Sequence, residues 1–203
     1  SDPDALEDAV VRAIIGDREL HKSQRVVLSS LRAGNSVLAV MATGRGKSLT
    51  FQVHAACEAL AHHTASLFVY PLRALIADQA FHINEALAPF GINARTLTGE
   101  SAPDERRQAF AGLANGSVDI VLTTPEFLVC HAPEFAATGR IGFVVVDEAH
   151  HIGLSRAGHR PAYAQLGSAI AQMGNPVVLA LTATSDEAVT SDIDRVLPVA
   201  GHV

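Results

Sequence analysis

Short apolar runs alternate with longer amphipathic segments along the whole chain. The runs are mostly apolar and rich in Val, Ile and Leu, which is typical of strands that are covered on both faces. The strands predicted in this way are Val37–Met41, Ser66–Tyr70, Asn93–Leu97, Asp119–Thr123, Phe143–Asp147 and Val177–Leu181.

Between these runs, apolar residues recur at helical spacing, and capping residues and glycines bound the segments. Ser23 and Ser185 are the predicted caps of two helices, and Asp104 is placed to complete a capping box behind Ser101. The predicted helices are Gln24–Arg32, Lys47–Leu60, Ala74–Ala88, Ala102–Leu113, Pro161–Met173 and Asp186–Leu197.

The regular alternation of strand and helix predicts an α/β fold, in which a mainly parallel sheet carries helices on both faces. Crossovers between parallel strands are right-handed, so the carboxyl ends of the strands share one edge of the sheet. Ligands of such folds bind at that edge, and the functional residues are expected there.

Composition excludes several classes of protein. With 203 residues, 48% of them hydrophobic, the chain can form one domain with a sizeable core. No apolar run approaches the roughly 18 residues of a membrane span, and the first residues lack the pattern of a signal peptide, so a cytoplasmic protein without membrane contact is expected. Cys57 and Cys130 form no CxxC pair, which favours a reducing compartment.

Charge and histidine content restrict the candidate ligands further. The net charge of −6 argues against a broad basic face, so any contact with nucleic acid would be local, through loops and helix ends. The ten histidines are scattered, and the doublets His62–His63 and His150–His151 lack the spacing of metal ligands. A histidine metal centre is therefore not predicted.

A glycine-rich turn connects the first predicted strand to the helix that follows it. Its glycines allow backbone N–H groups to face one anion, and the helix presents its positive end to the same anion. Met41 stands where a strict phosphate loop has its first glycine, although the Gly-Lys-Ser core is intact. The alternative is a chance glycine-rich turn. The residues predicted to bind the nucleotide phosphates are Thr43, Gly44, Arg45, Gly46, Lys47 and Ser48.

Two adjacent acids follow the buried run Phe143–Val146. Asp147, together with the Ser48 hydroxyl, is predicted to hold Mg²⁺, and Glu148 is predicted to orient and deprotonate an attacking water. A strand that merely ends in solvated acids is the alternative. The phosphate loop upstream favours the functional interpretation, because an enzyme of this type requires such an acidic partner.

An ordered set of motifs resembles the superfamily 2 helicases and covers nearly the whole chain. Asp147–His150 spells the DEAH signature, and Ala42–Ser48 resembles the family's phosphate loop. The further matching segments are Pro71–Leu75, Asp78–Gln79, Thr98–Gly99, Thr124–Glu126 and Thr182–Thr184. The resemblance implies a three-layer RecA-like domain that binds ATP and Mg²⁺, with Lys47, Asp147, Glu148 and His150 as its catalytic residues.

Within the superfamily, the chain is most similar to RecQ DNA helicases. Met41–Gly44 resembles their MPTG segment, Arg160–Tyr163 resembles their RPxY segment, and Gln24 stands at the place of their adenine-reading glutamine. A glutamine amide can bond both N6 and N7 of adenine, which accounts for a preference for ATP. The resemblance implies an ATP-dependent enzyme that acts on DNA in repair and recombination.

The same resemblance implies that single-stranded nucleic acid, DNA by family, crosses the carboxyl edge of the domain. The implied contacts are Pro71, Arg73, Thr98, Gly99, Thr124 and Pro125, and plain helix capping is the alternative for each. Thr182 and Thr184 would link that surface to Asp147 by hydrogen bonds. Capping of the following helix is their alternative.

Residues 1–203 are then expected to be the first RecA-like domain only. The family's second RecA-like domain supplies the arginines that complete the ATP site, and such an arginine is worth about 10³–10⁵ in rate. We therefore expect the isolated fragment to be nearly inactive, with turnover confined to a longer parent protein.

Two departures from the RecQ pattern leave alternatives open. The segment His151–His159 lacks the aromatic residues by which RecQ proteins couple DNA binding to hydrolysis, and Leu20 and His21 replace the aromatic residue that often precedes the glutamine. A nucleotide switch that binds nucleic acid without unwinding it is therefore a second hypothesis. A small-molecule kinase is a third, although it does not explain the DEAH segment or Thr182–Thr184.

Overall fold

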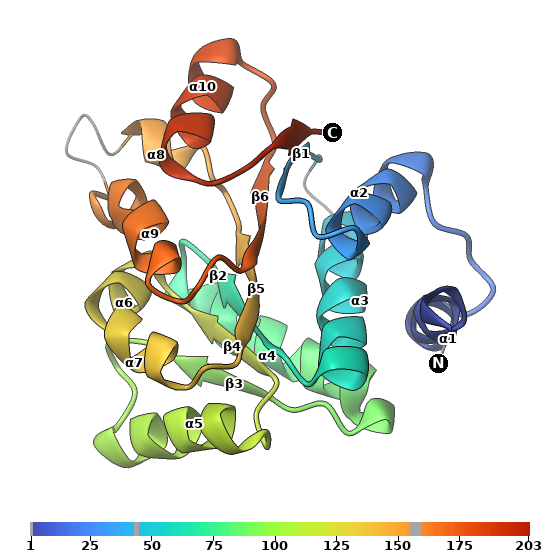
Figure 1. Cartoon of the computed structure of the whole chain (residues 1–203), viewed down its shortest axis with the longest axis horizontal. Coiled ribbons are helices and arrows are strands. Elements are labelled where there is room, and N and C mark those ends of the chain that lie inside the picture. Colours follow the sequence, from blue (N-terminus) through green and yellow to red (C-terminus); the bar gives the residue numbers. More distant parts are fainter. Residues whose placement is uncertain (1, 43–44, 155–159) are drawn as a thin grey trace.

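The computed structural model describes residues 2–42, 45–154 and 160–203. One seven-stranded sheet with the order β3-β4-β2-β5-β6-β1-β7 crosses the domain, and every strand pairing recorded among the described residues is parallel (Figure 1). The predicted α/β fold is confirmed. The strands are β1 Val37–Val40, β2 Ala65–Val69, β3 Ala94–Leu97, β4 Ile120–Thr123, β5 Ile141–Val146, β6 Val177–Thr182 and β7 Gly201–His202.

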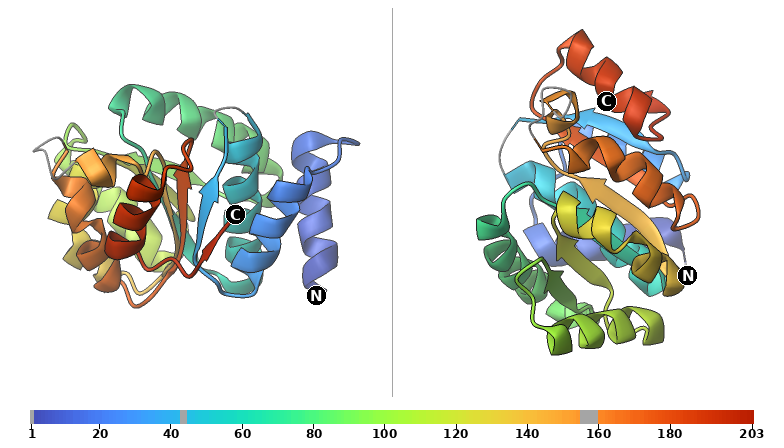
Figure 2. Two further views of the ribbon diagram at one scale, coloured as in Figure 1. Left: turned by 90° about the horizontal axis from the view of Figure 1, so that it is seen from above. Right: turned by 90° about the vertical axis from the view of Figure 1, so that its left-hand side faces the viewer.

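Helices cover both faces of the sheet, which gives the domain three layers (Figures 1 and 2). One layer contains α1 Pro3–Ile15, α2 Lys22–Arg32, α3 Arg45–His62 and α4 Arg73–Leu87, with the short helix η1 Ala88–Phe90. The other contains α5 Pro103–Asn115, α6 Pro125–Cys130, α7 Ala132–Ala137, α8 His151–Leu154, α9 Ala162–Ala171 and α10 Glu187–Val196. Figure 2 shows α1 outermost, on the far side of α2 and α3 from the sheet.

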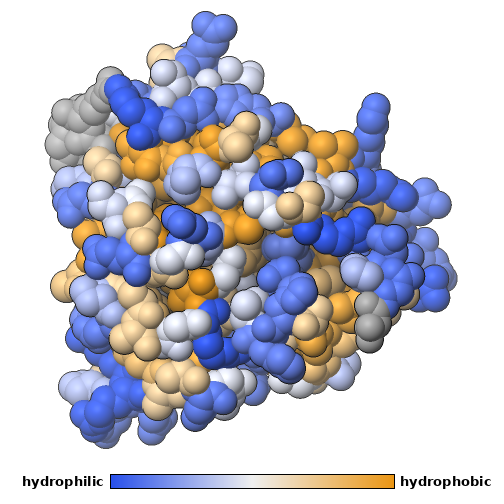
Figure 3. Space-filling model, viewed as in Figure 1, coloured by the Kyte–Doolittle hydropathy of each residue, from blue (hydrophilic) through white to orange (hydrophobic). Residues whose placement is uncertain are grey.

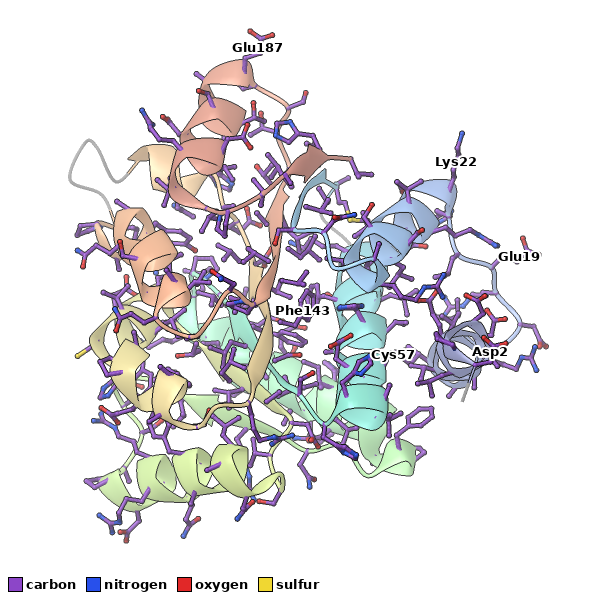
Figure 4. The ribbon with its side chains drawn as sticks, in the orientation of Figure 1. Asp2, Glu19, Lys22, Cys57, Phe143 and Glu187 are labelled. Carbon is purple, nitrogen blue, oxygen red and sulfur yellow. The ribbon has the colours of Figure 1, made fainter. Side chains whose placement is uncertain are left out.

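The core consists of two apolar clusters, one on each face of the sheet. Strand β5 contributes to both because successive side chains of a strand point to opposite faces. Phe143 and Val145 enter the cluster beneath α2, α3 and α4, whereas Val144 and Val146 enter the one beneath α5 to α10. Figure 4 shows Phe143 in the middle of the molecule, while Glu187 projects outward from α10. The central strands are therefore mostly apolar, with Ser66 of β2 as a buried polar exception.

The surface is mixed in character. In the space-filling view, hydrophilic side chains dominate the margin of the face shown, and hydrophobic ones lie between them nearer the middle (Figure 3). No helix in the described part of the chain combines the length and hydropathy that a membrane span requires.

The N-caps of α2 and α10 differ from the predicted residues. Helix α2 begins before Ser23, and the backbone N–H of its N-cap, His21, donates to Gln24 Oε1 at 2.7 Å. Helix α10 is capped by Asp186, whose Oδ1 accepts backbone N–H groups in the first turn, rather than by Ser185. Ser185 and Asp186 are both good N-cap residues, so they compete locally for α10, whereas the backbone N–H of the α2 N-cap is satisfied by the Gln24 side chain.

Some local structure was not predicted. Helix α1 is capped by Asp2, whose Oδ1 accepts from Asp4 N at 3.0 Å. In α5 the capping-box residue is Glu105 and not Asp104, because Glu105 Oε2 accepts from Ala102 N at 3.2 Å. Helices α1, α7 and α8 and the short edge strand β7 are also additional to the prediction. They are short or peripheral, so the apolar pattern does not mark them strongly.

A substitution in the packing of α9 against α10 tests the fold. A Cβ built at Gly167 would lie 1.9 Å from the carbonyl oxygen of Val196, so Gly167→Ala must push the two helices apart. Overpacking costs about 1–3 kcal/mol, which outweighs a gain of up to about 1 kcal/mol in helix propensity. We expect a lower free energy of unfolding in urea.

Gly201→Ala is the matched control, because a Cβ at Gly201 meets no atom within 4 Å. The control should unfold like the wild type. If Gly167→Ala were equally stable, the close packing of α9 on α10 would be wrong.

Candidate active site and nucleic-acid interface

The phosphate loop follows β1 and leads directly into α3. Thr43 and Gly44 lie outside the described residues, as does the side chain of Arg45. Gln24 is only 3% exposed, and its Nε2 donates to the carbonyl oxygen of Gly46 at 2.9 Å. A Cβ at position 46 would lie 2.7 Å from that nitrogen, so a larger residue there would displace the Gln24 amide from its present position.

Lys47 connects the loop to the acid pair at the end of β5. Its Nζ lies 2.8 Å from Asp147 Oδ1 and 3.6 Å from Glu148 Oε1. The side chains of Lys47 and Asp147 are 14% and 12% exposed, so this ion pair is only weakly screened by water. The fold thus brings together the loop lysine and both acids that the sequence predicted to act on one triphosphate.

Neighbouring strands hold the backbone of the acid pair. Asp147 N donates to Val69 O at 3.0 Å, and Ala149 N donates to Leu181 O at 2.8 Å. Glu148, between them, has a φ of 51°, in the left-handed region that non-glycine residues seldom occupy. Such conformations persist where the surroundings enforce them, and they gather at functional sites.

The rings of His150, His151 and Tyr163 form a series of contacts between Glu148 and helix α9. His150 Nδ1 lies 3.3 Å from Glu148 Oε2, and the His150 ring stacks on His151 with centroids 4.6 Å apart. The His151 ring lies 5.2 Å from that of Tyr163, whose hydroxyl donates to the carbonyl oxygen of Asp147 at 3.3 Å. Burial, and then the neighbouring His150, lower the pKa of His151, which favours its neutral form.

The sequence prediction did not identify His151. The doublet His150–His151 was considered only as a candidate pair of metal ligands, and the segment that follows the DEAH signature contains no Trp, Phe or Tyr. An imidazole next to the signature histidine was the available signal. Burial also raises the pKa of Tyr163, so its hydroxyl stays protonated and able to donate at neutral pH.

Thr182, the last residue of β6, and Thr184 beyond it form local hydrogen bonds with the backbone. Thr182 Oγ1 accepts from Thr184 N at 3.3 Å, and Thr184 Oγ1 accepts from Asp186 N at 3.2 Å. Among the described residues, neither hydroxyl is recorded in a hydrogen bond to Asp147. The contact from β6 to the acidic segment instead runs through the backbone of Ala149 and Leu181.

A groove lies at the carboxyl ends of β2, β3 and β4. Four predicted nucleic-acid contacts line one cavity of about 700 Å³, and they come from the loops after β2, β3 and β4. These four are Pro71, Arg73, Gly99 and Thr124. Thr98 adjoins the cavity and accepts Glu100 N on its hydroxyl at 3.2 Å. The structure therefore gathers most of the predicted contacts on one surface.

Two of the predicted nucleic-acid contacts, Thr124 and Pro125, form the start of helix α6. Thr124 is 5% exposed, and its hydroxyl caps α6 by accepting from Phe127 N at 3.2 Å. Pro125 is buried in the first turn of the same helix. The capping alternative thus holds for the Thr124 side chain, and the buried ring of Pro125 is poorly placed for a surface contact.

Arg160 joins the groove to the acid pair. Its Nε and Nη2 lie 2.9 and 3.3 Å from the two carboxylate oxygens of Glu126, and Nη1 donates to Pro71 O at 2.7 Å. The guanidinium carbon also lies 5.5 Å from the centre of the Tyr163 ring. One side chain therefore spans two groove loops and the tyrosine that binds Asp147.

The described residues contain no group of three or more His, Cys, Asp or Glu side chains that could hold a metal ion. The candidate magnesium ligands are oxygen donors, namely the carboxylate of Asp147 and the hydroxyl of Ser48. Mg²⁺ prefers such donors and usually completes its shell with water and substrate phosphates. The donor set fits magnesium bound together with a nucleotide.

Taken together, a parallel sheet that ends in a phosphate-loop lysine and an adjacent acid pair defines a nucleoside-triphosphate-binding α/β domain. More narrowly, the chain belongs to the DEAD/DEAH box helicase family, whose sequence profile matches residues 21–192. It is the ATP-binding domain of a superfamily 2 helicase.

The relatives are DNA helicases of the RecQ type. The chain is 33% identical over 196 residues to the ATP-dependent DNA helicase RecQ of Haemophilus influenzae, covering 95% of this chain and 30% of that protein. It is 31% identical over 207 residues to the ATP-dependent DNA helicase Q-like 2 of Arabidopsis thaliana, covering 97% and 28% respectively. The chain thus spans less than a third of each relative.

Solved structures share the fold. The DUF1998 helicase MrfA bound to DNA and AMPPNP superposes with a TM-score of 0.76 at 20% identity, over 96% of this chain and 29% of that chain. The Hef helicase domain of Pyrococcus furiosus superposes with a TM-score of 0.68 at 24% identity, over 90% and 37% respectively. These similarities confirm the predicted RecA-like architecture.

Lys47→Ala tests the geometry of the nucleotide site. Because Lys47 is the cation that faces both acids, its loss should weaken binding of a fluorescent ATP analogue with magnesium by at least about tenfold, or about 1.4 kcal/mol. Arg12→Ala removes the same charge from the exposed face of α1 and should leave the affinity unchanged. Equal affinities of Lys47→Ala and wild type would place the phosphates elsewhere.

Proposed function

We propose that this domain binds Mg-ATP and, in a longer parent protein, couples ATP hydrolysis to movement on single-stranded DNA. The observation that carries the proposal is the contact of Lys47 with Asp147 and Glu148. The parent would supply a second RecA-like domain. A cytoplasmic location and a role in DNA repair and recombination belong to the same proposal.

The chemistry is a phosphoryl transfer to water. Lys47 and the loop N–H groups would hold the β- and γ-phosphates, and Glu148 would orient a water and accept its proton as the oxygen attacks the γ-phosphorus. The bond from the γ-phosphorus to the bridging oxygen breaks, and ADP leaves. Magnesium, held by Asp147 and Ser48, would supply positive charge to the phosphate oxygens.

Gln24 supports adenine recognition. Its amide has two N–H donors and two acceptor lone pairs on the oxygen, of which the contacts to Gly46 O and from His21 N use one each. One donor and one lone pair remain, which suit N7 and N6 of adenine. Because both contacts fix the amide, it is already oriented before ATP binds.

The groove supports binding of nucleic acid. Its walls carry the guanidinium groups of Arg73, Arg106 and Arg160, which can bind phosphate oxygens, although Arg73 and Arg160 are paired with Glu100 and Glu126. Relatives described as DNA helicases favour DNA as the ligand. Contacts to the sugar-phosphate backbone would position the strand without reading its sequence.

DNA binding in the groove would be coupled to ATP hydrolysis through Arg160 and Tyr163. A phosphate that draws Arg160 away from Glu126 would disturb its contacts with Pro71 O and with the Tyr163 ring. Tyr163 in turn donates to Asp147 O. This route needs no aromatic residue in the segment after the DEAH signature, part of which lies outside the described residues.

A nucleotide switch that does not unwind DNA is the second candidate. The lack of Trp, Phe and Tyr in His151–His159 favours it, because stacking of a base on an aromatic ring is worth roughly 1–3 kcal/mol. Strand separation by the parent protein would reject the switch. A small-molecule kinase is excluded by membership of the helicase family.

Glu148→Gln in the parent protein tests the assigned chemistry. The amide keeps the shape of the side chain but accepts a proton poorly, so DNA-stimulated ATP turnover should fall by at least about 100-fold while ATP binding persists. Glu187→Gln, on the exposed start of α10, is the control for loss of one carboxylate. Turnover by Glu148→Gln at the wild-type rate would remove Glu148 from the mechanism. Stimulation by oligo(rU) but not oligo(dT) would contradict the assignment of DNA.

A further inference from the structure

Two of the three groove arginines are already paired with carboxylates. Arg73 Nη1 lies 2.7 Å from Glu100 Oε1, and Arg160 forms a two-point contact with Glu126. A phosphate must compete with these carboxylates before it can use either guanidinium group. The two pairs therefore add little net positive charge to the groove.

Arg106, on the first turns of α5, differs from both. Its Nε donates to Ser101 O at 3.1 Å and its Nη2 donates to Gly99 O at 3.1 Å, and both acceptors are neutral carbonyls. In the parts of the chain that the structure describes, no ion pair of Arg106 is recorded. A guanidinium group has five N–H donors, so three remain for a ligand. Arg106 thus carries the uncompensated charge of the groove.

The Arg106 side chain is also held in place. Its guanidinium carbon lies 5.5 Å from the centre of the Phe127 ring, and Phe127 is only 4% exposed. The ring and the two carbonyls fix the fork on the cavity wall. A group that is fixed in advance loses little side-chain entropy when it binds an anion.

We propose that Arg106 is the principal phosphate-binding side chain of the groove, and that it binds non-bridging oxygens of a phosphodiester in the single strand. The proposal rests on the proposed function and goes further, because no helicase motif identified in the sequence includes Arg106. It assigns the main electrostatic contact to α5, whereas Arg73 and Arg160 become available only when their carboxylates are displaced.

A purely structural role is the competing explanation. Arg106 could serve only to fasten the turn Thr98–Ser101, which contains the predicted contacts Thr98 and Gly99. Such a role depends on the fork of hydrogen bonds. A phosphate contact depends mainly on charge, so Arg106→Lys separates the two because it keeps the charge and loses the fork.

Binding of fluorescein-labelled oligo(dT) by the 203-residue chain, measured by anisotropy over a series of salt concentrations, tests the proposal. We expect Arg106→Gln to bind about five- to tenfold more weakly, and its slope of log affinity against log salt to be shallower by about 0.7. Arg106→Lys should keep the wild-type slope.

Arg107→Gln is the matched control. Arg107 is the next residue on the same helix, it is 73% exposed, and it pairs with Asp104. The variant removes the same charge from the chain and should bind within about twofold of the wild type. Equal thermal unfolding curves would show that all three variants are folded. Should Arg106→Gln fail to fold, a crystal of the wild type with oligo(dT) decides the question by the distance from Arg106 to the nearest phosphate.

The outcomes separate the two proposals. If the wild type binds oligo(dT) and Arg106→Gln binds equally well, or if Arg106→Lys is as impaired as Arg106→Gln, the role of Arg106 is wrong and the proposed function stands. A phosphate far from Arg106 in the crystal would overturn it in the same way. If the wild type does not bind oligo(dT) even at low salt, both the proposed DNA-binding function and the proposed role of Arg106 are wrong.

Discussion

Lys47 lies between two carboxylates at the carboxyl edge of the sheet, and the arrangement of the domain follows from the need to hold these charges together. Charges that are largely removed from water require compensation, and loss of one partner from such a cluster is costly. Lys47 belongs to the first turn of α3 and the acids follow β5, so the parallel sheet must set both in register. The acidic segment donates backbone hydrogen bonds to Val69 O and Leu181 O and accepts one from the Tyr163 hydroxyl, and these bonds keep its backbone in position.

The same edge of the sheet carries the groove, and the two sites share structural parts. Arg160 touches Glu126 and the Pro71 carbonyl on the groove side, and its neighbour Tyr163 binds the carbonyl of Asp147 on the nucleotide side. A ligand in the groove would therefore meet Arg160, which contacts the tyrosine that is bonded to Asp147. This proximity gives a physical basis for coupling in a domain whose net charge of −6 does not favour nucleic acid as such.

The fold could be predicted from sequence because the central strands form mostly apolar runs, and covered parallel strands require them. Site residues such as Lys47 and Asp147 could be predicted because each belongs to a short sequence motif next to one of these runs. Features that depend on contacts between distant parts of the chain could not be predicted from sequence. Examples are the hydrogen bond from the Gln24 amide on α2 to Gly46 O on α3, and the contact of the His151 ring with that of Tyr163. The helix caps were misplaced because adjacent polar residues compete locally.

The most direct test of the account is a crystal structure of the domain with Mg²⁺ and a non-hydrolysable ATP analogue. The account predicts that Lys47 Nζ leaves Asp147 to bind the β- and γ-phosphates, that Asp147 faces the magnesium, and that Glu148 borders the γ-phosphate. A triphosphate bound away from the loop, with the Lys47–Asp147 ion pair intact at its present 2.8 Å, would contradict the central claim.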